Sequence, residues 1–510
     1  MSLRALAAWL LLTLVVLGLR VGAGWPGGVD RDENQDCWNA RCLAAGGTDF
    51  RGNRWPLILE DYGDDKHALY AWMLAGFERA GVTIRPERAR WFSALLLALG
   101  SLLFGIALAL RTESRTVGFV GLLCFGLLPW FQVGPCLAWE CATSPPAYAA
   151  MFCGLALVGR RSGLGWTLFF AGFVVGIYGY PAPKVLAPIL LAAAALLFAR
   201  GWRSRVAVFG VGSLLALPLL LAHLDDASTT DRAAHILVGS VSAFLAHWRS
   251  YWAPSFLLLH GDSLPRHFAG FLGVLPFALL GAALWNGVAA LAHGRMWPQR
   301  ALDRYALVAL LVFPLPAALT DDGSGHVLRS LLGGVAWAWF GTLGLAAILA
   351  KRSLVGRVLI GLVLAQCLTN LVWIRFVWRN AQTTRDVFHG TFYSDLRAAI
   401  VPRRPARVFF SPLPMPLTSA FPFIHFGWTA LDSQPIPGQI DAVVTRFAAG
   451  VPHLATTGSP RVGVWIGQAA TTAGADLVIQ IDSVAGPIGF ERIAGLNPPM
   501  ALWLRPKAQR

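Results

Sequence analysis

Long apolar stretches alternate with short polar segments along most of the chain. An apolar helix of about 20 residues is needed to cross the hydrocarbon core of a bilayer. Stretches that approach this length lie at 3–22, 91–110, 116–133, 145–158, 164–181, 184–199, 205–222, 270–293, 305–320, 330–350 and 354–374. The pattern predicts a polytopic α-helical membrane protein with about 11 transmembrane helices. The first stretch also resembles a signal peptide, but it lacks a clean small-x-small cleavage site, so we interpret it as a retained helix.

The composition supports this interpretation. Of 510 residues, 56% are hydrophobic and only 14% are charged, whereas about 25% are charged in soluble domains. These values exclude a disordered chain, a small disulfide-rich protein and an ordinary cytosolic enzyme. The net charge of +15 also occurs in nucleic-acid-binding proteins. Here the cations form short clusters between apolar stretches, so membrane topology explains them better and no nucleic acid is expected.

The distribution of Arg and Lys predicts the orientation of the chain. With the N-terminus inside, every second loop is short and basic; these loops are 111–115, 159–162, 200–205, 294–304 and 351–357. The alternate loops are longer and hold acids, histidines and aromatics; they are 23–90, 131–144, 178–184, 223–269 and 321–329. We expect the second set on the periplasmic side of a bacterial inner membrane, together with the C-terminal region.

From about residue 400 the chain changes character. Short β-type runs separated by Gly, Pro and Ser occur at 406–410, 441–447, 461–466, 476–481 and 501–504, and such runs are typical of strands. The sequence therefore predicts a transmembrane domain over 1–375, with an acidic first outer loop at 23–90. A small extracytoplasmic α/β domain is predicted over 376–510.

Four cysteines lie in two of the predicted outer loops. Cys37 and Cys42 are in the first, and Cys136 and Cys141 are in the second. The outer compartment is oxidising, so disulfides can persist there. Pairing within each loop and a cross-link between the loops both fit the sequence. Zinc binding is a less favoured interpretation, because no histidine lies at ligand spacing beside these cysteines.

The first outer loop begins with an adjacent acid pair, Asp32 and Glu33. Such a pair beside a membrane can act as a general base or bind a divalent cation. Solvated loop acids and helix capping are the alternative explanations. Few charges lie at the centres of the apolar stretches, which argues against a proton-coupled transporter or a voltage sensor.

Short motifs follow one another through five outer loops. They are Asp32-Glu33, Gly47-Thr48-Asp49, Pro56 and Gly63 to Tyr70, then Pro129-Trp130 and Glu140, Tyr178 to Lys184, Tyr251 to His267, and Pro314 to Thr320 with His326 and Arg329. In order and spacing they resemble GT-C glycosyltransferases, specifically the bacterial relatives of protein O-mannosyltransferases, over roughly residues 1–350. Cys136 in the second loop and Lys184 in the third stand where that family has Arg, and the replacement at Cys136 puts the role of the second loop in doubt.

The resemblance implies a GT-C fold and an inverting hexosyl- or pentosyltransferase. The sugar would pass from a polyprenyl-phosphate carrier to a hydroxyl of a glycolipid, a cell-envelope glycan or a protein. Asp32 would be the general base, with Glu33 or Glu140 assisting. The same three carboxylates are candidates for binding Mg²⁺ or Mn²⁺.

Release of the donor phosphate requires cations and hydrogen-bond donors around its growing charge. The candidates for this role are Lys66, Tyr70, Tyr180, Lys184, Arg266, His267, His326 and Arg329. The alternative for the long cationic side chains is snorkelling to the interface, and for the tyrosines an aromatic belt. No Walker loop is visible in the sequence, which favours a lipid-linked donor over a nucleotide sugar.

Two other functions fit the same sequence. A ligase or polymerase of lipid-linked glycans also uses arginines in outer loops, but it does not resemble the early Asp-Glu pair. A non-enzymatic flippase would move a lipid-linked sugar without forming a new glycosidic bond.

Overall fold

The computed structural model describes residues 3–21, 25, 29–49, 52–61, 64–225, 237–292 (except 263, 265, 266 and 269), 300–381 and 384, and the backbone of strands between 407 and 504. The chain divides into two compact units. The first consists of Met1–Trp25 and Arg90–Trp378, and the second of Pro26–Ala89 and Arg379–Arg510. The first outer loop thus belongs to the same unit as the C-terminal region.

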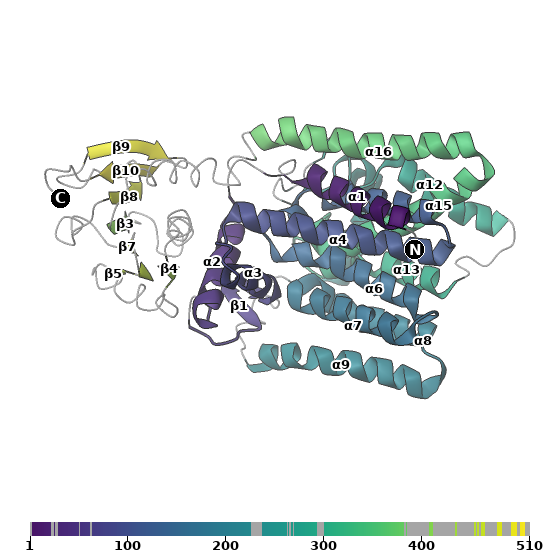
Figure 1. The fold of residues 1–510 in the computed structure, drawn as a ribbon, viewed down its shortest axis with the longest axis horizontal. Coiled ribbons are helices and arrows are strands. Elements are labelled where there is room, and N and C mark those ends of the chain that lie inside the picture. The colour runs from purple at the N-terminus through teal and green to yellow at the C-terminus, as the bar shows by residue number, and fades with distance from the viewer. Residues whose placement is uncertain are drawn as a thin grey trace. The chain divides into compact units, whose positions relative to one another are not determined.

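The first unit is built from helices that lie side by side (Figure 1). They are α1 (Leu3–Arg20), α4 (Pro86–Thr112, which begins in the second unit), α5 (Arg115–Gly126), α6 (Ser144–Val158), α7 (Ser162–Gly179), α8 (Pro181–Phe198), α9 (Gly201–Asp225), α11 (Val241–Ser250), α12 (Phe277–Ala292), α13 (Ala301–Val312), α14 (Leu315–Ala318), α15 (Leu331–Lys351) and α16 (Ser353–Phe376).

Among the described residues, nine helical stretches are long and apolar enough to cross a membrane, and two apolar helices are shorter. The protein is therefore a multi-pass membrane protein. The shorter helices fall on the predicted stretches 116–133 and 270–293. The first stretch leaves the α-helix at Leu127, just before Pro129, and the second becomes helical only after Pro276, because proline lacks the backbone N–H that a helix interior requires.

Packing between the helices relies in part on small residues. A Cβ atom added to Gly154 of α6 would lie 2.6 Å from the carbonyl oxygen of Gly165 in α7, and one on Gly165 would lie 2.8 Å from that of Gly154. This close approach of two backbones is typical of helix pairs in membranes. Large apolar side chains such as Leu214 of α9 and Leu354 of α16 are exposed, as expected for surfaces that face lipid.

Loops predicted to share the cytoplasmic side contact one another. Arg111, at the end of α4, forms an ion pair with Asp303 in the first turn of α13. The side chain of Arg300 donates a hydrogen bond to the carbonyl oxygen of Arg111. Arg160, between α6 and α7, lies 3.6 Å from Glu113. These loops therefore lie together at one end of the helices, as expected if successive loops lie on opposite sides of the membrane.

The second unit contains a helix, a hairpin and a further helix from the first outer loop. These are α2 (Arg31–Gly46), β1 (Ile58–Asp61), β2 (Asp64–His67) and α3 (Leu69–Arg79). The hairpin is antiparallel, with Leu59 opposite Lys66. Buried Leu43, Leu59 and small alanines of α3 form a common core. The loop is therefore a folded element.

The described C-terminal strands form a six-stranded mixed sheet and a two-stranded one. Their bounds are β3 (Arg407–Ser411), β4 (Gln434–Pro435), β5 (His453–Leu454), β6 (Thr456–Thr457), β7 (Arg461–Val464), β8 (Leu477–Ile481), β9 (Glu491–Leu496) and β10 (Met500–Leu504). The larger sheet has the order β5-β7-β3-β8-β10-β9. Its β7-β3-β8 pairings are parallel, and the others are antiparallel. The predicted run at 441–447 lies outside the described residues.

The four cysteines of the first two outer loops are divided between the two units. Cys37, Cys42, Cys136 and Cys141 are all buried, and no disulfide joins them in the part of the chain that the structure describes. Cys37 and Cys42 lie on the single helix α2, where an offset of five residues separates the Cα atoms by about 7.5 Å along the axis. A disulfide needs Cα atoms within about 7 Å, so a bridge between these two would have to break the helix.

Candidate active site

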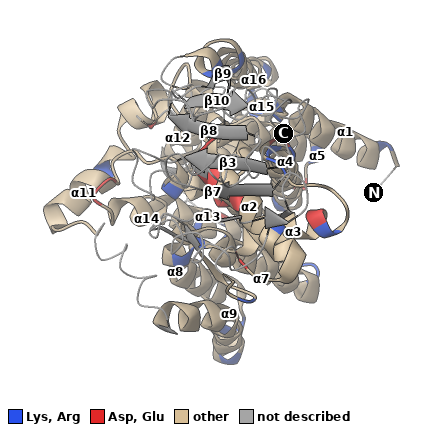
Figure 2. Cartoon of the chain, turned by 90° about the vertical axis from the view of Figure 1, so that its left-hand side faces the viewer, with Lys and Arg blue, Asp and Glu red and all other residues tan. Residues whose placement is uncertain are grey.

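The acid pair of the first outer loop lies in the first turn of α2 (Figure 2, where acidic positions are red). Asp30 is the N-cap residue, and its carboxylate accepts a hydrogen bond of 2.9 Å from the backbone N–H of Asp32. The Glu33 carboxylate accepts one of 3.0 Å from the N–H of Asp30. This reciprocal arrangement is a capping box. It gives Glu33, which is fully buried, a structural partner, while Asp32 remains partly exposed.

Asp32 and Lys66 form an ion pair. The Lys66 Nζ atom lies 3.8 Å from Asp32 Oδ1, and the side chains are 7% and 27% exposed. The hairpin places Lys66 on β2, where a strand residue projects to one face of the ribbon. The pair thus joins the predicted general base to a predicted phosphate ligand.

Tyr70 lies in the first turn of α3 and is fully buried. Its hydroxyl donates a hydrogen bond of 3.2 Å to the carbonyl oxygen of Ala89, in the first part of α4. Sequence analysis made Tyr70 a donor-phosphate candidate. In the structure its hydroxyl ties α3 to α4.

The second outer loop consists of 3₁₀ turns, which are η1 (Pro129–Phe131), η2 (Gly134–Cys136) and η3 (Glu140–Thr143). The start of this loop contacts Arg20 of α1, which was not predicted as a site residue. Arg20, buried at the end of α1, donates hydrogen bonds to the carbonyl oxygens of Gly126 (2.8 Å), Leu128 (3.3 Å) and Phe131 (3.2 Å). A cation at a helix C-terminus satisfies carbonyls that lack intrahelical partners.

Arg20 also lies beside the position where the resembled family has an arginine. Its Nη1 atom is 4.0 Å from the Cys136 sulfur. Burial raises the pKa of the Cys136 thiol, and the nearby guanidinium opposes the shift. A guanidinium therefore adjoins the second loop although Cys136 itself carries none. Arg20 stands at the polar end of an apolar stretch, and this position was its only signal in the sequence.

Tyr180 lies close enough to both Glu140 and Arg329 to interact electrostatically with each of them. Burial raises the pKa of Tyr180, Cys141 and Glu140 act in the same direction, and Arg329 opposes them. Tyr180 therefore remains a neutral phenol that can donate a hydrogen bond. Predicted site residues from the second, third and fifth outer loops are thus neighbours in the first unit.

Lys184 lies in the first turn of α8 and is exposed. Its Nζ atom is 3.2 Å from the Nε2 atom of His223, near the end of α9. The pair joins the predicted outer ends of two adjacent helices. The exposure of Lys184 at the end of a span fits interfacial snorkelling as well as phosphate binding.

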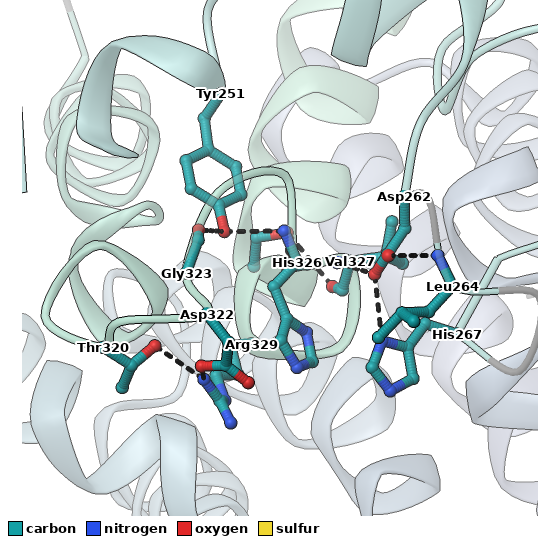
Figure 3. A network of polar contacts seen from close by, with 11 residues as sticks. Tyr251, Asp262, Leu264, His267, Thr320, Asp322, Gly323, His326, Val327 and Arg329 are labelled. Carbon is teal, nitrogen blue, oxygen red and sulfur yellow. Dashed lines mark hydrogen bonds and ion pairs between the residues drawn. The ribbon is translucent and has the colours of Figure 1, made fainter. Parts of the chain in front are cut away.

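The fourth and fifth outer loops meet in a polar network (Figure 3). The hydroxyl of buried Tyr251 donates to the carbonyl oxygen of Gly323 and accepts a hydrogen bond of 2.8 Å from the N–H of His326. The Asp262 carboxylate contacts the His267 ring at 3.1 Å, and the rings of His267 and His326 stack with centroids 4.4 Å apart. The structure thus brings both predicted histidines together, while Arg266 lies outside the described residues.

Arg329 completes this network. Its Nη1 atom donates to Thr320 Oγ1 at 2.6 Å and to Asp322 Oδ1 at 2.5 Å. Burial alone would raise the pKa of Asp322, but the hydrogen bond and charge of Arg329 outweigh it and hold this pKa below its usual value. Arg329 was predicted as a site residue, whereas Tyr251, Asp262 and Asp322, which take part in the same network, were not. Tyr251 and Asp262 stood in the quoted motif, which was the available signal.

No protein-family model and no curated protein matches the chain. Among solved structures it is similar to the oligosaccharyltransferase AglB from Archaeoglobus fulgidus, in complex with an inhibitory peptide and a dolichol-phosphate (TM-score 0.46, 10% identity, 94% of this chain and 69% of that chain). The Archaeoglobus fulgidus oligosaccharyltransferase complex with Zn and sulfate gives 0.47 and 12%, over 93% and 68%.

The arabinofuranosyltransferase AftD from Mycobacteria is also similar, with a TM-score of 0.47 and 15% identity. All of this chain is covered, but only 40% of AftD. Sequence identities and TM-scores this low do not assign the chain to a family. The fold and site define a multi-pass membrane protein whose outer loops fold into two polar clusters, one in each unit. Its function must be inferred from its own residues.

Proposed function

We propose that the protein is a membrane glycosyltransferase that moves a sugar from a polyprenyl-phosphate carrier to a hydroxyl acceptor on the outer side of a bacterial inner membrane. The observation that carries this proposal is the Asp32–Lys66 ion pair, 3.8 Å long and largely buried. It joins a carboxylate with some solvent access to a cation, and these are the two groups that glycosyl transfer from a phosphate requires.

The chemistry assigns one role to each group. The acceptor oxygen attacks the anomeric carbon, and its proton passes to the Asp32 carboxylate. The bond between that carbon and the phosphate oxygen breaks, and the phosphate leaves with the bonding electrons. The Lys66 ammonium supplies N–H donors to the leaving phosphate and offsets its growing negative charge. The donor's single displacement inverts the anomeric centre.

Arg329, Tyr180 and Lys184 remain candidates for contacts to the lipid phosphate or the sugar. Tyr180 and Arg329 are electrostatic neighbours in the first unit. The acceptor class, whether glycolipid, envelope glycan or protein, belongs to the same proposal. The network around Arg329 gives a cation that is already oriented by Thr320 and Asp322, so little conformational entropy is lost on binding.

The predicted Mg²⁺ or Mn²⁺ ligands are Asp32, Glu33 and Glu140, whose carboxylate oxygens are the donor type that such hard cations prefer. The contacts of Asp32 and Glu33, however, do not favour binding of a divalent cation. The Lys66 ammonium adjoins Asp32 and would repel a divalent ion. One oxygen of Glu33 accepts a capping hydrogen bond. The proposed transfer therefore uses no metal at Asp32.

The test is transfer from a panel of radiolabelled polyprenyl-phosphate sugars into membrane extracts. Asp32→Asn is compared with wild type and with Asp321→Asn, which removes an exposed acid. We expect Asp32→Asn to lower transfer by about 10²–10⁴-fold at equal protein level, and the control to retain it. Equal transfer by wild type and Asp32→Asn would contradict the general-base role.

The rival functions predict other outcomes. For a glycan ligase or polymerase, Arg266→Ala would abolish activity while Asp32→Asn would not. For a flippase, wild type in proteoliposomes would translocate the lipid-linked sugar and form no glycosidic bond with any donor of the panel.

A further inference from the structure

Three potential metal ligands converge where the fourth and fifth outer loops meet. The side chains of Asp262, His267 and His326 each offer one ligand atom, and these atoms lie within 4.8 Å of one another. The Asp262 and His267 side chains are 5% and 7% exposed, and His326 is 6% exposed. Figure 3 shows both imidazole rings on the same side of the Asp262 carboxylate. This cluster is distinct from the acidic pair of the first loop.

Backbone contacts fix the carboxylate in place. Asp262 Oδ1 accepts a hydrogen bond of 2.9 Å from the N–H of Leu264, and Oδ2 accepts one of 2.9 Å from the N–H of Val327. Tyr251 holds the backbone of His326 through a 2.8 Å hydrogen bond to its N–H. Such outer contacts orient metal ligands in established sites. Here they lock ligands from two loops against each other.

The spacing of the ligand atoms suits a small divalent ion. Bonds of about 2.0 Å in tetrahedral geometry place neighbouring ligand atoms about 3.3 Å apart. Asp262 Oδ2 and His267 Nδ1 are already 3.1 Å apart. The near-parallel rings of His267 and His326, inclined by 21°, can reach a common ion by side-chain rotation. Two neutral imidazoles and one carboxylate leave one positive charge on the complex.

We propose that Asp262, His267 and His326 bind one divalent transition-metal ion, with Zn²⁺ the preferred ion. Imidazole nitrogen with a single carboxylate favours zinc over magnesium or calcium, which prefer oxygen ligands. The three ligands leave a fourth coordination position for water or another oxygen ligand. The bound ion links the fourth outer loop to the fifth and so restrains the segment that leads to Arg329. This inference does not depend on glycosyl transfer.

The experiment measures metal on the purified full-length protein without any substrate. The protein is isolated through a tag that contains no histidine, stripped with a chelator and reloaded with Zn²⁺, and the bound metal is measured by elemental mass spectrometry. Reloading with Co²⁺ adds a visible absorption spectrum that reports the coordination geometry. The variants are His326→Ala and Asp262→Asn, with His260→Ala, an exposed histidine of the same loop, as the matched control.

We expect about one equivalent of Zn²⁺ in wild type and in His260→Ala, and a tetrahedral Co²⁺ spectrum. His326→Ala should weaken Zn²⁺ binding by more than about 100-fold, beyond the 10–100-fold typical of outer contacts. Asp262→Asn keeps the size of the side chain and an acceptor for Val327, so it tests the ligand role if His326→Ala fails to fold.

Two results would overturn the assignment. One is a wild type that binds neither Zn²⁺ nor Co²⁺ stoichiometrically. The other is a folded His326→Ala or Asp262→Asn variant that retains wild-type metal content and spectrum. Neither result bears on sugar transfer, which is measured separately with Asp32→Asn.

Discussion

The carboxylate of Asp32 and the ammonium of Lys66 lie 3.8 Å apart, at the start of helix α2 and on strand β2 of the neighbouring hairpin. Each group affects the surroundings of the other, because their opposite charges attract and the Lys66 side chain is only 7% exposed. If both act in one step, their removal should not be additive. A double-mutant cycle measures this coupling directly.

We therefore predict that Asp32→Asn and Lys66→Gln each lower the transfer rate by about 10²–10⁴-fold. The double variant should be no slower than the slower single variant, because the second substitution removes a group that no longer has its partner. Initial rates with a saturating lipid-linked donor give the comparison. Multiplicative losses in the double variant would show that the two groups act independently.

A second prediction concerns the buried arginine of α1. Arg20→Met should lower the thermal midpoint by several degrees, because each buried carbonyl left without a partner costs about 1–3 kcal/mol. Arg20 contacts three such carbonyls. Arg4→Met, at an exposed position of the same helix, should leave the midpoint unchanged. A thermal scan in detergent that finds the two variants equally stable would rule out this role for Arg20.

The third prediction uses pH. Arg329 holds the pKa of Asp322 below its usual value, so the folded state favours the ionised carboxylate. The resulting stability is fully present above the unfolded-state pKa of about 3.9 and is lost as the pH falls through the lower folded-state pKa. Asp322→Asn should therefore lower the thermal midpoint between pH 6 and 8, and its difference from wild type should shrink as the pH falls below about 4. A variant with the acid profile of wild type would contradict the assignment.

The fourth prediction concerns the cysteines of the outer loops. Under denaturing, non-reducing conditions, all seven thiols should react with an alkylating reagent, because no disulfide joins them in the described part of the structure. In the folded protein the reaction should be slow, since burial raises the pKa of Cys42 and Cys136 and so lowers their thiolate fraction. Intact mass gives the count. A mass two hydrogens lower per pair, with correspondingly fewer labels, would reveal a disulfide.

The sequence by itself determined the membrane character and the position of the helices. Apolar length is a local property, so every predicted stretch contains a helix, and only the proline-bounded ones at 116–133 and 270–293 fell short of a full span. The local sequence also predicted several C-terminal strands, since β3, β7, β8 and β10 fall on predicted runs.

The tertiary structure decided which polar residues are neighbours. Composition and spacing could not reveal that Lys66 meets Asp32, that Arg20 reaches Cys136, or that Asp262 gathers His267 and His326. Except for Asp262 and His267, these contacts join residues far apart in the sequence, so they depend on which loops pack together. Local backbone geometry decided two further points. Glu33 closes the capping box that Asp30 begins at the start of α2, and Cys37 and Cys42 lie on that one helix, too far apart for a bridge between them.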